Sequence, residues 1–173
     1  MEKTRLPLQV RRRRWIFGTL SAVMMAVIFW MSAMPARESA EVSGAVTDVA
    51  VRVAYPDYPK MPKQRQQTVY RLVQHFVRKS AHFLEYMVLG ALMLFLFNTF
   101  SWRLKPLWAW LAASAYAATD EWHQAFVAGR GPMATDVLID ASGAALGVIL
   151  ACLTLLLISH CKKKRAQKTT AQA

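Results

Sequence analysis

The sequence predicts an all-α, polytopic membrane protein: a bundle of four transmembrane helices with both termini in the cytoplasm. Hydrophobic residues make up 55% of the 173 residues and charged residues only 18%, whereas soluble domains average roughly 45–50% and about 25%. Several apolar stretches reach the roughly 20 residues that a helix needs to cross a bilayer. In addition, 22 basic residues outnumber 10 acidic ones, and the resulting net charge of +12 gathers beside the apolar stretches.

The first predicted span covers residues 15–34, which contain no charged residue. Trp15 and Trp30 lie near its ends, where aromatic rings favour the membrane interface. The basic residues before it are typical of a secretory signal, but such a signal has an apolar stretch of only about 7–15 residues. We therefore expect this helix to be retained.

The other spans are predicted at residues 81–100, 105–125 and 137–158. The middle one has the weakest signal, because its uninterrupted apolar stretch covers only residues 107–118. It crosses the membrane only if Asp120 and the polar residues after it lie within or just above the bilayer. We include it because an even number of spans places both basic termini on one side.

The basic residues sort with these four spans. The segments expected in the cytoplasm hold 13 basic residues and one acidic residue, and the rest of the chain holds nine of each. Those segments are residues 1–14, 101–106 and 159–173. This is the positive-inside pattern of membrane proteins. Because a nucleic-acid-binding surface would not follow hydropathy in this way, we expect no nucleic-acid partner.

The predicted organisation is a basic N-terminus, a membrane domain and a basic tail, at residues 1–14, 15–158 and 159–173. An extracytoplasmic loop, residues 35–78, joins the first two spans and contains several prolines, so it is not one helix. Valines at helical spacing predict a short amphipathic helix on the outer surface. Residues 67–78 have an apolar face and are expected to run into the second span. The sequence leaves open whether this loop is ordered, and whether it is a tether or a lid.

Polar residues converge at the predicted outer ends of the spans. On the second span, Lys79, His82, Glu85 and Tyr86 share one helix face. The third span ends, and the fourth begins, with further members of this cluster: Asp120, Glu121, His123, Gln124, Arg130, Asp136 and Asp140. A charged group near the middle of a membrane helix costs at least about 2.5–3.5 kcal/mol. Such residues persist where they are paired in a bundle interior or perform a function, so this cluster is the candidate site.

Three chemistries fit the cluster. Glu85 and Asp120 are candidate acid/base residues, with His82 and His123 as tuning partners. Lys79 and Arg130 are candidate anchors for a phosphate or carboxylate, and the other candidate binding residues are Tyr86, Glu121, Gln124, Asp136 and Asp140. A divalent metal held by histidines and glutamates of the cluster is a weaker alternative, because the spacing matches no recognised zinc pattern.

Simpler structural roles are open for some of these residues. Asp136 is placed to complement the dipole of a helix N-terminus, and Arg130 to pair with a carboxylate. Gly143 and Gly147 form a GxxxG motif, which predicts close packing against another helix. The two cysteines are too few for a disulfide scaffold.

Three separated motifs carry a family resemblance: residues 78–86 (RKSAHFLEY), 120–130 (DEWHQAFVAGR) and 136–143 (DVLIDASG). In order and spacing, over about residues 15–158, they resemble the pattern of VanZ-like membrane proteins. Residues 31–36 (MSAMPA) also resemble the exit of that family's first span. Asp140 departs from the pattern, because many relatives carry Asn there.

The resemblance implies a multi-pass protein of the bacterial cytoplasmic membrane. The family's namesake is associated with resistance to teicoplanin, a glycopeptide with a lipid tail, more than to vancomycin. The resemblance assigns no catalytic roles. It marks the signature positions Lys79, His82, Glu85, Tyr86, Asp120, Glu121, Gln124, Arg130, Asp136, Asp140 and Gly143.

Two hypotheses of function follow. In the first, the protein is an enzyme or remodelling factor that acts at the outer leaflet on a lipid-linked envelope component or a lipid head group. In the second, it is a non-catalytic binding or scaffold protein that limits the access of lipid-tailed ligands to cell-wall precursors. A transporter is disfavoured, because four short spans show no inverted repeat or broken helix. The substrate and the oligomeric state are open.

Overall fold

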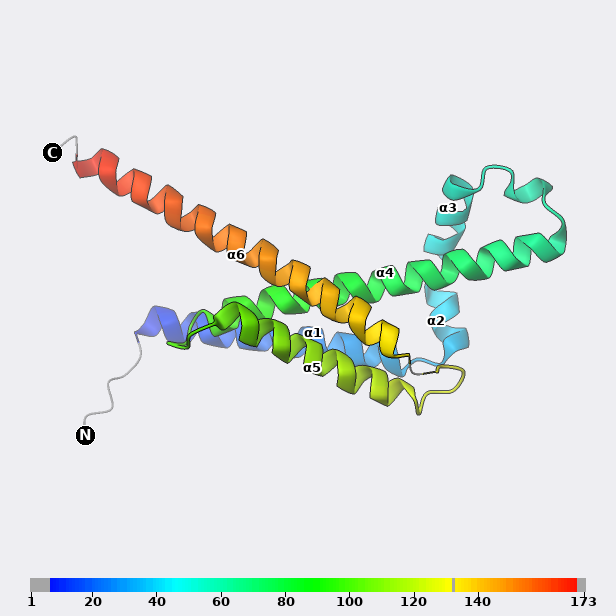
Figure 1. Cartoon of the computed structure of the whole chain (residues 1–173), viewed down its shortest axis with the longest axis horizontal. Helices are drawn as coiled ribbons and strands as arrows, with labels where there is room; N and C mark the ends of the chain where they lie inside the picture. The colour runs from blue at the N-terminus through cyan, green and yellow to red at the C-terminus, as the bar shows by residue number, and fades with distance from the viewer. Residues whose placement is uncertain (1–6, 132, 171–173) are drawn as a thin grey trace.

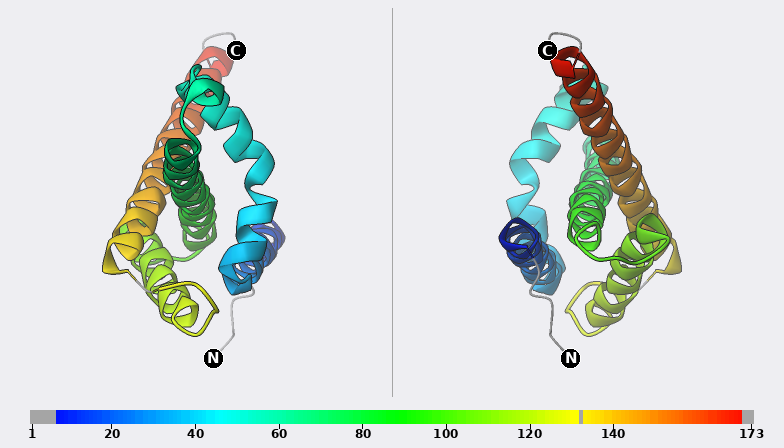
Figure 2. Two further views of the ribbon diagram at one scale, coloured as in Figure 1. Left: turned by 90° about the vertical axis from the view of Figure 1, so that its right-hand side faces the viewer. Right: turned by 90° about the vertical axis from the view of Figure 1, so that its left-hand side faces the viewer.

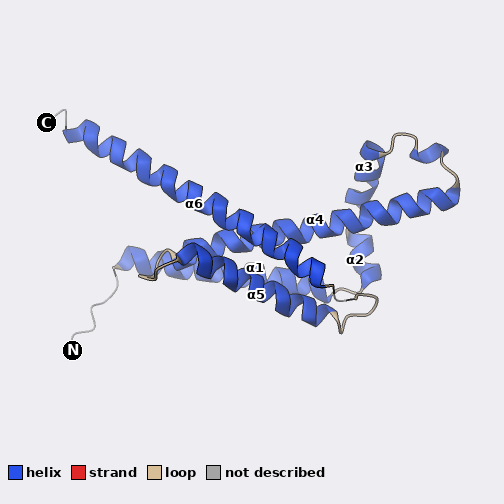
Figure 3. Ribbon diagram, viewed as in Figure 1, coloured by secondary structure: helices blue, strands red, loops and turns tan. Residues whose placement is uncertain are grey.

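The computed structural model describes residues 7–131 and 133–170, and this part is all-helical, without strands, which confirms the all-α fold class. The elements are α1 (Leu8–Ala33), α2 (Ala36–Val42), α3 (Gly44–Ala54), the 3-10 helix η1 (Tyr58–Lys60), α4 (Lys63–Phe97), α5 (Lys105–Gln124) and α6 (Ala134–Thr170). The four long helices form an elongated bundle, and α2 and α3 stand across one end of it (Figure 1). Figure 3 shows that short loops join the helices.

Three of these helices are long and apolar enough to cross a membrane: α1, α4 and α6 as far as Arg165. The 20-residue α5 helix is long enough, at about 1.5 Å per residue, to cross the roughly 30 Å hydrocarbon core. It is less apolar than the other three, because Asp120 and Glu121 lie in its last turns. The structure therefore supports three candidate spans, and the fourth span and the location of the termini stay predictions.

The α4 and α6 helices cross at a contact built from glycines. Gly143 and Gly147 of α6 lie against the α4 backbone, and Gly90 of α4 lies against the α6 backbone at Ala144. A Cβ atom added at Gly147 would overlap the carbonyl oxygen of Met87. The absence of side chains on the glycines thus lets the two backbones meet, as small residues do between membrane helices. On both sides of this crossing the two helices diverge (Figure 1).

The α5 helix packs into the bundle through small residues and two hydrogen bonds. Every fourth residue of one face is a fully buried alanine: Ala109, Ala113 and Ala117. The Trp110 indole donates to the Ala141 carbonyl of α6 at 3.0 Å, and the Tyr116 hydroxyl donates to the Met25 carbonyl of α1 at 2.6 Å. These bonds fix α5 between its two neighbours and thereby set the position of its polar last turn.

The α4 helix starts at Lys63, well before the predicted span at residue 81. Residues 67–78 are therefore continuous with that span, and the predicted loop over residues 35–78 contains three helical elements and the beginning of α4. The α3 helix packs on α4 through buried Thr47 and Val51. In views along the bundle, α4 lies between α6 on one side and α2 and α3 on the other (Figure 2).

Candidate functional site

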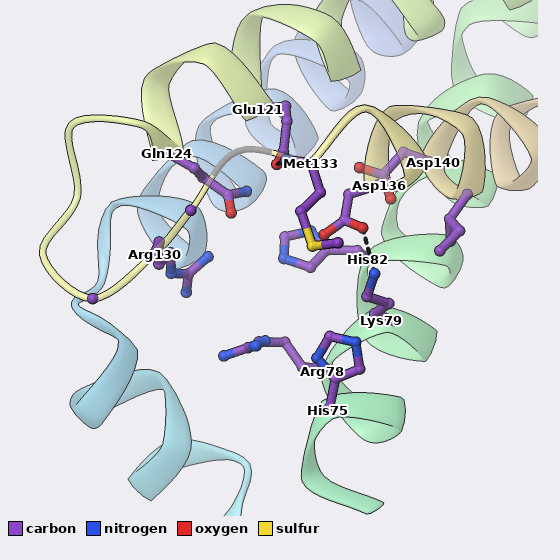
Figure 4. Close-up of a pocket in the computed structure, with 13 residues that line it drawn as sticks. His75, Arg78, Lys79, His82, Glu121, Gln124, Arg130, Met133, Asp136 and Asp140 are labelled. Carbon is purple, nitrogen blue, oxygen red and sulfur yellow. Dashed lines mark hydrogen bonds and ion pairs between the residues drawn. The ribbon is translucent and has the colours of Figure 1, made fainter. Parts of the chain in front are cut away.

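A pocket of about 290 Å³ opens where the middle of α4, the end of α5 and the start of α6 meet the loop between α5 and α6. Its polar lining comes from all four segments (Figure 4). The lining residues are His75, Arg78, Lys79, His82, Glu121, Gln124, Gly129, Arg130, Gly131, Met133, Asp136, Ile139 and Asp140. Gly129 has a φ of 74°, a left-handed conformation that favours glycine, and it helps to turn the loop back over the pocket.

Two of the pocket's carboxylates are already engaged. Asp136, in the first turn of α6, forms an ion pair with Lys79 of α4 (Figure 4). Glu121 accepts a 2.6 Å hydrogen bond from the backbone N–H of Met133, so it anchors the loop that leads into α6. Both interactions hold the pocket walls together and leave these two acids with less charge to offer a ligand.

Two guanidinium groups face the same side of the pocket. Arg78 projects from α4 toward the loop that carries Arg130 (Figure 4). Arg130 donates from Nη2 to the Met31 carbonyl at 3.1 Å, and its buried Nε has no partner among the described residues. Burial and, after it, the nearby positive charge of Arg78 lower the pKa of Arg130. An anion between the two guanidiniums would relieve this repulsion.

Behind the pocket, α1 and α5 are joined by a buried polar contact. Ser32 donates to Asp120 Oδ2 at 2.8 Å, and Gln124 donates to the same oxygen at 3.2 Å. Gln124 also lies 3.3 Å from the Ser32 hydroxyl, and Ser32 is completely buried. Asp120 does not line the pocket. Its contacts tie the end of α1 to the end of α5.

A second group of buried polar atoms lies deeper in the bundle, on α4 and at Asp120 of α5. His82 Nδ1 is 3.5 Å from Glu85 Oε2, but the geometry does not make a hydrogen bond, and both atoms are buried. The Tyr86 hydroxyl and Asp120 Oδ1 are also buried and find no partner in the described part of the chain. Buried polar atoms in native proteins are usually hydrogen-bonded to protein or water. This group is therefore suited to hold water or a polar part of a ligand.

In the structure, the residues of the predicted cluster lie in the pocket lining, in the buried group behind it, and at the contact with α1. The pocket lining includes seven of the candidate residues: Lys79, His82, Glu121, Gln124, Arg130, Asp136 and Asp140. Glu85, Tyr86 and Asp120 lie outside the lining, at the buried level described above. His123 points to α1, where its ring packs on Phe29 at 4.5 Å between centroids.

Sequence reasoning missed several residues of this region. His75 and Arg78 line the pocket from the part of α4 that precedes the predicted span. Each lies four residues before a predicted site residue, His75 before Lys79 and Arg78 before His82, and this helical spacing is the signal that could have identified them. Ser32 gives no such signal, because its contact with Asp120 joins helices far apart in the sequence.

No group of three or more His, Cys, Asp or Glu side chains within residues 7–131 and 133–170 is placed to hold a metal ion. The weaker metal alternative combined His82 and Glu85 with Glu121 and His123. In the fold these residues point in different directions, because Glu121 is bonded to Met133 and His123 packs on α1.

An apolar groove continues from the pocket along α4. It encloses about 600 Å³ and is lined by Leu72, His75, Phe76, Lys79, Ser80, Phe83, Leu84 and Ile139. It shares His75, Lys79 and Ile139 with the polar pocket. A ligand with a polar head and an apolar chain could occupy both, with Lys79 at the boundary between them.

The comparisons with known proteins agree with the motifs. A family profile described as VanZ/LLP1 matches residues 17–157, which include the pocket, the glycine contact and all three motifs. No curated protein and no solved structure matched the chain. The matched region covers most of the chain, and the resemblance seen in the sequence is confirmed: this protein belongs to the VanZ/LLP1 family.

Proposed function

We propose that this protein binds the anionic head group of a lipid-linked envelope component at the outer leaflet of the bacterial cytoplasmic membrane. One observation carries the proposal: two guanidiniums, Arg78 and Arg130, line a pocket that continues into an apolar groove. The proposal adopts the four-span topology predicted from the sequence, in which both termini lie in the cytoplasm and this pocket faces the outer side.

The charges in the pocket favour a negatively charged ligand. Of the pocket's three carboxylates, Asp136 is paired with Lys79 and Glu121 is bonded to a backbone N–H, so only Asp140 stands against the two guanidiniums. The hydrogen bond that Arg130 makes goes to a neutral carbonyl, so it does not neutralise the guanidinium. Guanidinium groups recognise phosphate and carboxylate oxygens with paired hydrogen bonds.

The groove favours a ligand that carries an apolar chain. Leu72 and Phe76 on its outer part are 60% and 70% exposed, although both are large hydrophobic residues. Leu72 and Leu84 lie 12 residues apart on α4, which corresponds to about 18 Å. This length would accommodate a substantial part of an acyl or prenyl chain.

The proposal is tested by lipid binding to the purified protein in detergent. Dioctanoyl phosphatidic acid is the probe, and dioctanoylglycerol, which lacks the phosphate, is the comparison. Arg78→Gln should weaken binding of the phosphate lipid about tenfold, because a charge-assisted hydrogen bond contributes about 1.5–3 kcal/mol. Arg65→Gln removes the same charge from an exposed position of α4 outside the pocket and should change binding less than about twofold.

Equal binding of the two lipids by the wild type would refute an anionic ligand. Equal losses in the two variants would mean that the effect comes from the general positive charge of α4. Arg130→Lys provides a further check, since it keeps the charge but loses the planar donor pair. The proposal expects it to weaken binding while the protein remains folded.

If the pocket also performs chemistry, the geometry favours His82 and Asp140 over the pair predicted from the sequence. His82 and Asp140 line the pocket, while Glu85 and Asp120 lie behind it. Asp140 is 4% exposed and has no hydrogen-bond partner within the described chain, so it is available as a proton donor or acceptor.

The resistance role implied by the family belongs to this proposal as well. The same variant set can be expressed at matched levels in a strain that lacks the gene, with teicoplanin and vancomycin susceptibility measured side by side. A pocket that handles lipid-tailed ligands predicts protection against teicoplanin that Arg78→Gln loses and Arg65→Gln keeps. Further loss in Asp140→Asn, with lipid binding retained, would favour the enzyme over the scaffold.

A further inference from the structure

A separate cleft lies at the opposite end of the bundle, near both termini. It encloses about 350 Å³ between α1, α4 and α6. Its lining residues are Val10, Arg13, Phe17, Phe95, Asn98, Thr99, Leu155, Ile158 and Lys162. None of them belongs to the outer pocket or to the three sequence motifs.

The cleft has a polar, basic rim and an aromatic and aliphatic floor. Arg13 and Lys162 supply positive charges from α1 and α6, and Asn98 and Thr99 supply polar groups from the end of α4. On the floor, the rings of Phe17 and Phe95 stack with their centroids 5.2 Å apart. A ligand that matches both surfaces has a charged head and an apolar chain.

One wall of the rim is held in place by the neighbouring arginine. Arg14 donates from Nη2 to the Thr99 carbonyl at 2.9 Å and from Nε to its hydroxyl at 3.3 Å. Its guanidinium also lies 3.9 Å from the centroid of the Phe100 ring. These contacts fix the start of α1 to the end of α4, so the cleft is a formed feature of the bundle.

Within the described residues, the helices that form this cleft carry positive charge at this end without an acidic counterpart. The α1 helix contains no Asp or Glu, α4 contains none after Glu85, and α6 contains none after Asp140. Arg13 and Lys162 are therefore not neutralised by carboxylates of the helices that form the cleft. The ligand that complements them is an anion.

We infer that this cleft binds the phosphate head group of an anionic membrane phospholipid, whose acyl chain lies on Phe17, Phe95, Leu155 and Ile158. Arg13 and Lys162 contact the phosphate, and Asn98 contacts the polar part of the head group. Basic pockets between membrane helices are known to recognise such lipids. The site needs only that the end of the bundle lies at a membrane surface, so it is independent of what the outer pocket binds.

The test uses the purified full chain in detergent and native mass spectrometry or a thermal-shift titration with dihexanoyl phosphatidylglycerol. The double variant Arg13→Gln/Lys162→Gln should bind this lipid at least about tenfold more weakly, since each basic residue near an anionic lipid contributes about 1 kcal/mol. The matched control is Arg12→Gln/Lys164→Gln. It removes the same charge from the same two helices at exposed positions outside the cleft and should stay within about twofold of wild type.

Two comparison ligands and one further variant complete the test. Inorganic phosphate should compete poorly, because it lacks the acyl chain, and dihexanoyl phosphatidylcholine should bind weakly, because its head group is neutral overall. Ile158 is 47% exposed, so Ile158→Ser should weaken lipid binding without unfolding the protein. This variant keeps the inference testable if the double variant does not fold. Equal losses in the cleft and control variants, or competition by phosphate as strong as by the lipid, would overturn the inference.

Discussion

Lys79 and Asp136 join α4 to the first turn of α6 in the lining of the polar pocket. Their side chains are 21% and 28% exposed, so water screens the ion pair only in part. Asp136 also lies at the positive end of the α6 dipole, which stabilises its negative charge. Asp136 therefore has the predicted place at the helix end together with an ion pair that was not predicted, and the carboxylate pairing expected of Arg130 is made by Lys79 instead.

Removing one partner should therefore cost more than removing both. Lys79→Met leaves a half-buried carboxylate without its partner and should lower the thermal midpoint in detergent by several degrees. The double variant Lys79→Met/Asp136→Leu leaves no unpaired charge and should recover much of that loss. Thermal unfolding of the three proteins, with Lys60→Met as an exposed-pair control, measures the difference. A double variant that recovers none of the stability lost in Lys79→Met would contradict this expectation.

The sequence predicted which residues gather at the outer ends of the helices, because helical spacing fixes the side chains that share a face. It did not predict which of these residues line the pocket and which contact α1. The side chain of His123 turns to Phe29 and that of Asp120 to Ser32, and both partners lie on α1, about 90 residues earlier. Spacing along one helix carries no information about which neighbouring helix that face will meet. Arg130 was predicted as an anchor, but its partner Arg78 was not, since Arg78 lies before the apolar stretch that drew attention to the span.

At the scale of elements, the contact between α4 and α6 depends on glycines that leave no room for a side chain. Gly147→Ala should strongly destabilise the bundle, because the new Cβ would overlap the carbonyl of Met87 and force the helices apart. Gly18→Ala on α1 is the matched control, since its nearest neighbouring atom, on Leu96, is 3.9 Å from the added Cβ. Alanine is the better helix former by about 1 kcal/mol, so this change should be neutral or stabilising.

Thermal unfolding and size-exclusion profiles in detergent measure both glycine variants. If Gly147→Ala is as stable as Gly18→Ala, the α4–α6 contact is looser than the backbone geometry indicates. The motif itself was visible in the sequence, but its partner on α4 was not, because GxxxG identifies a close contact without identifying the other helix.

At the scale of the whole molecule, the number of membrane crossings decides which side each end of the bundle faces. With four spans, Cys161 lies on the same side as the N-terminus, in the cytoplasm; with α5 outside the membrane, Cys161 would lie opposite the N-terminus. In a Cys152→Ala background, a membrane-impermeant maleimide should label exposed Cys161 only after the cells are opened. An Ala54→Cys variant without Cys161 should be labelled in intact cells, because Ala54 is exposed at the end of α3. Labelling of Cys161 in intact cells would contradict the four-span topology.

The fold class followed from the sequence because apolar length and charge placement depend on membrane physics and not on tertiary detail. The bounds of the helices were harder to predict from the sequence. The α4 helix begins at Lys63 and α6 continues to Thr170, since a helix does not stop where the membrane does. Hydropathy marks only the part of each helix in contact with lipid, so it underestimates the lengths of α4 and α6. The short apolar stretch of α5 illustrates the same limit, because its buried alanines pack on protein and need little hydrophobicity.

The crossing of α4 and α6 also has a mechanical consequence. Two stiff rods that touch at one fulcrum enclose equal angles on its two sides, so widening the wedge at one end widens the wedge at the other. The pocket with Arg78 lies in one wedge, and the cleft with Lys162 lies in the other. A ligand that widens one wedge would therefore also widen the other. Binding at one end of the bundle would change the geometry at the other end, across the bilayer, through the contact of the three glycines.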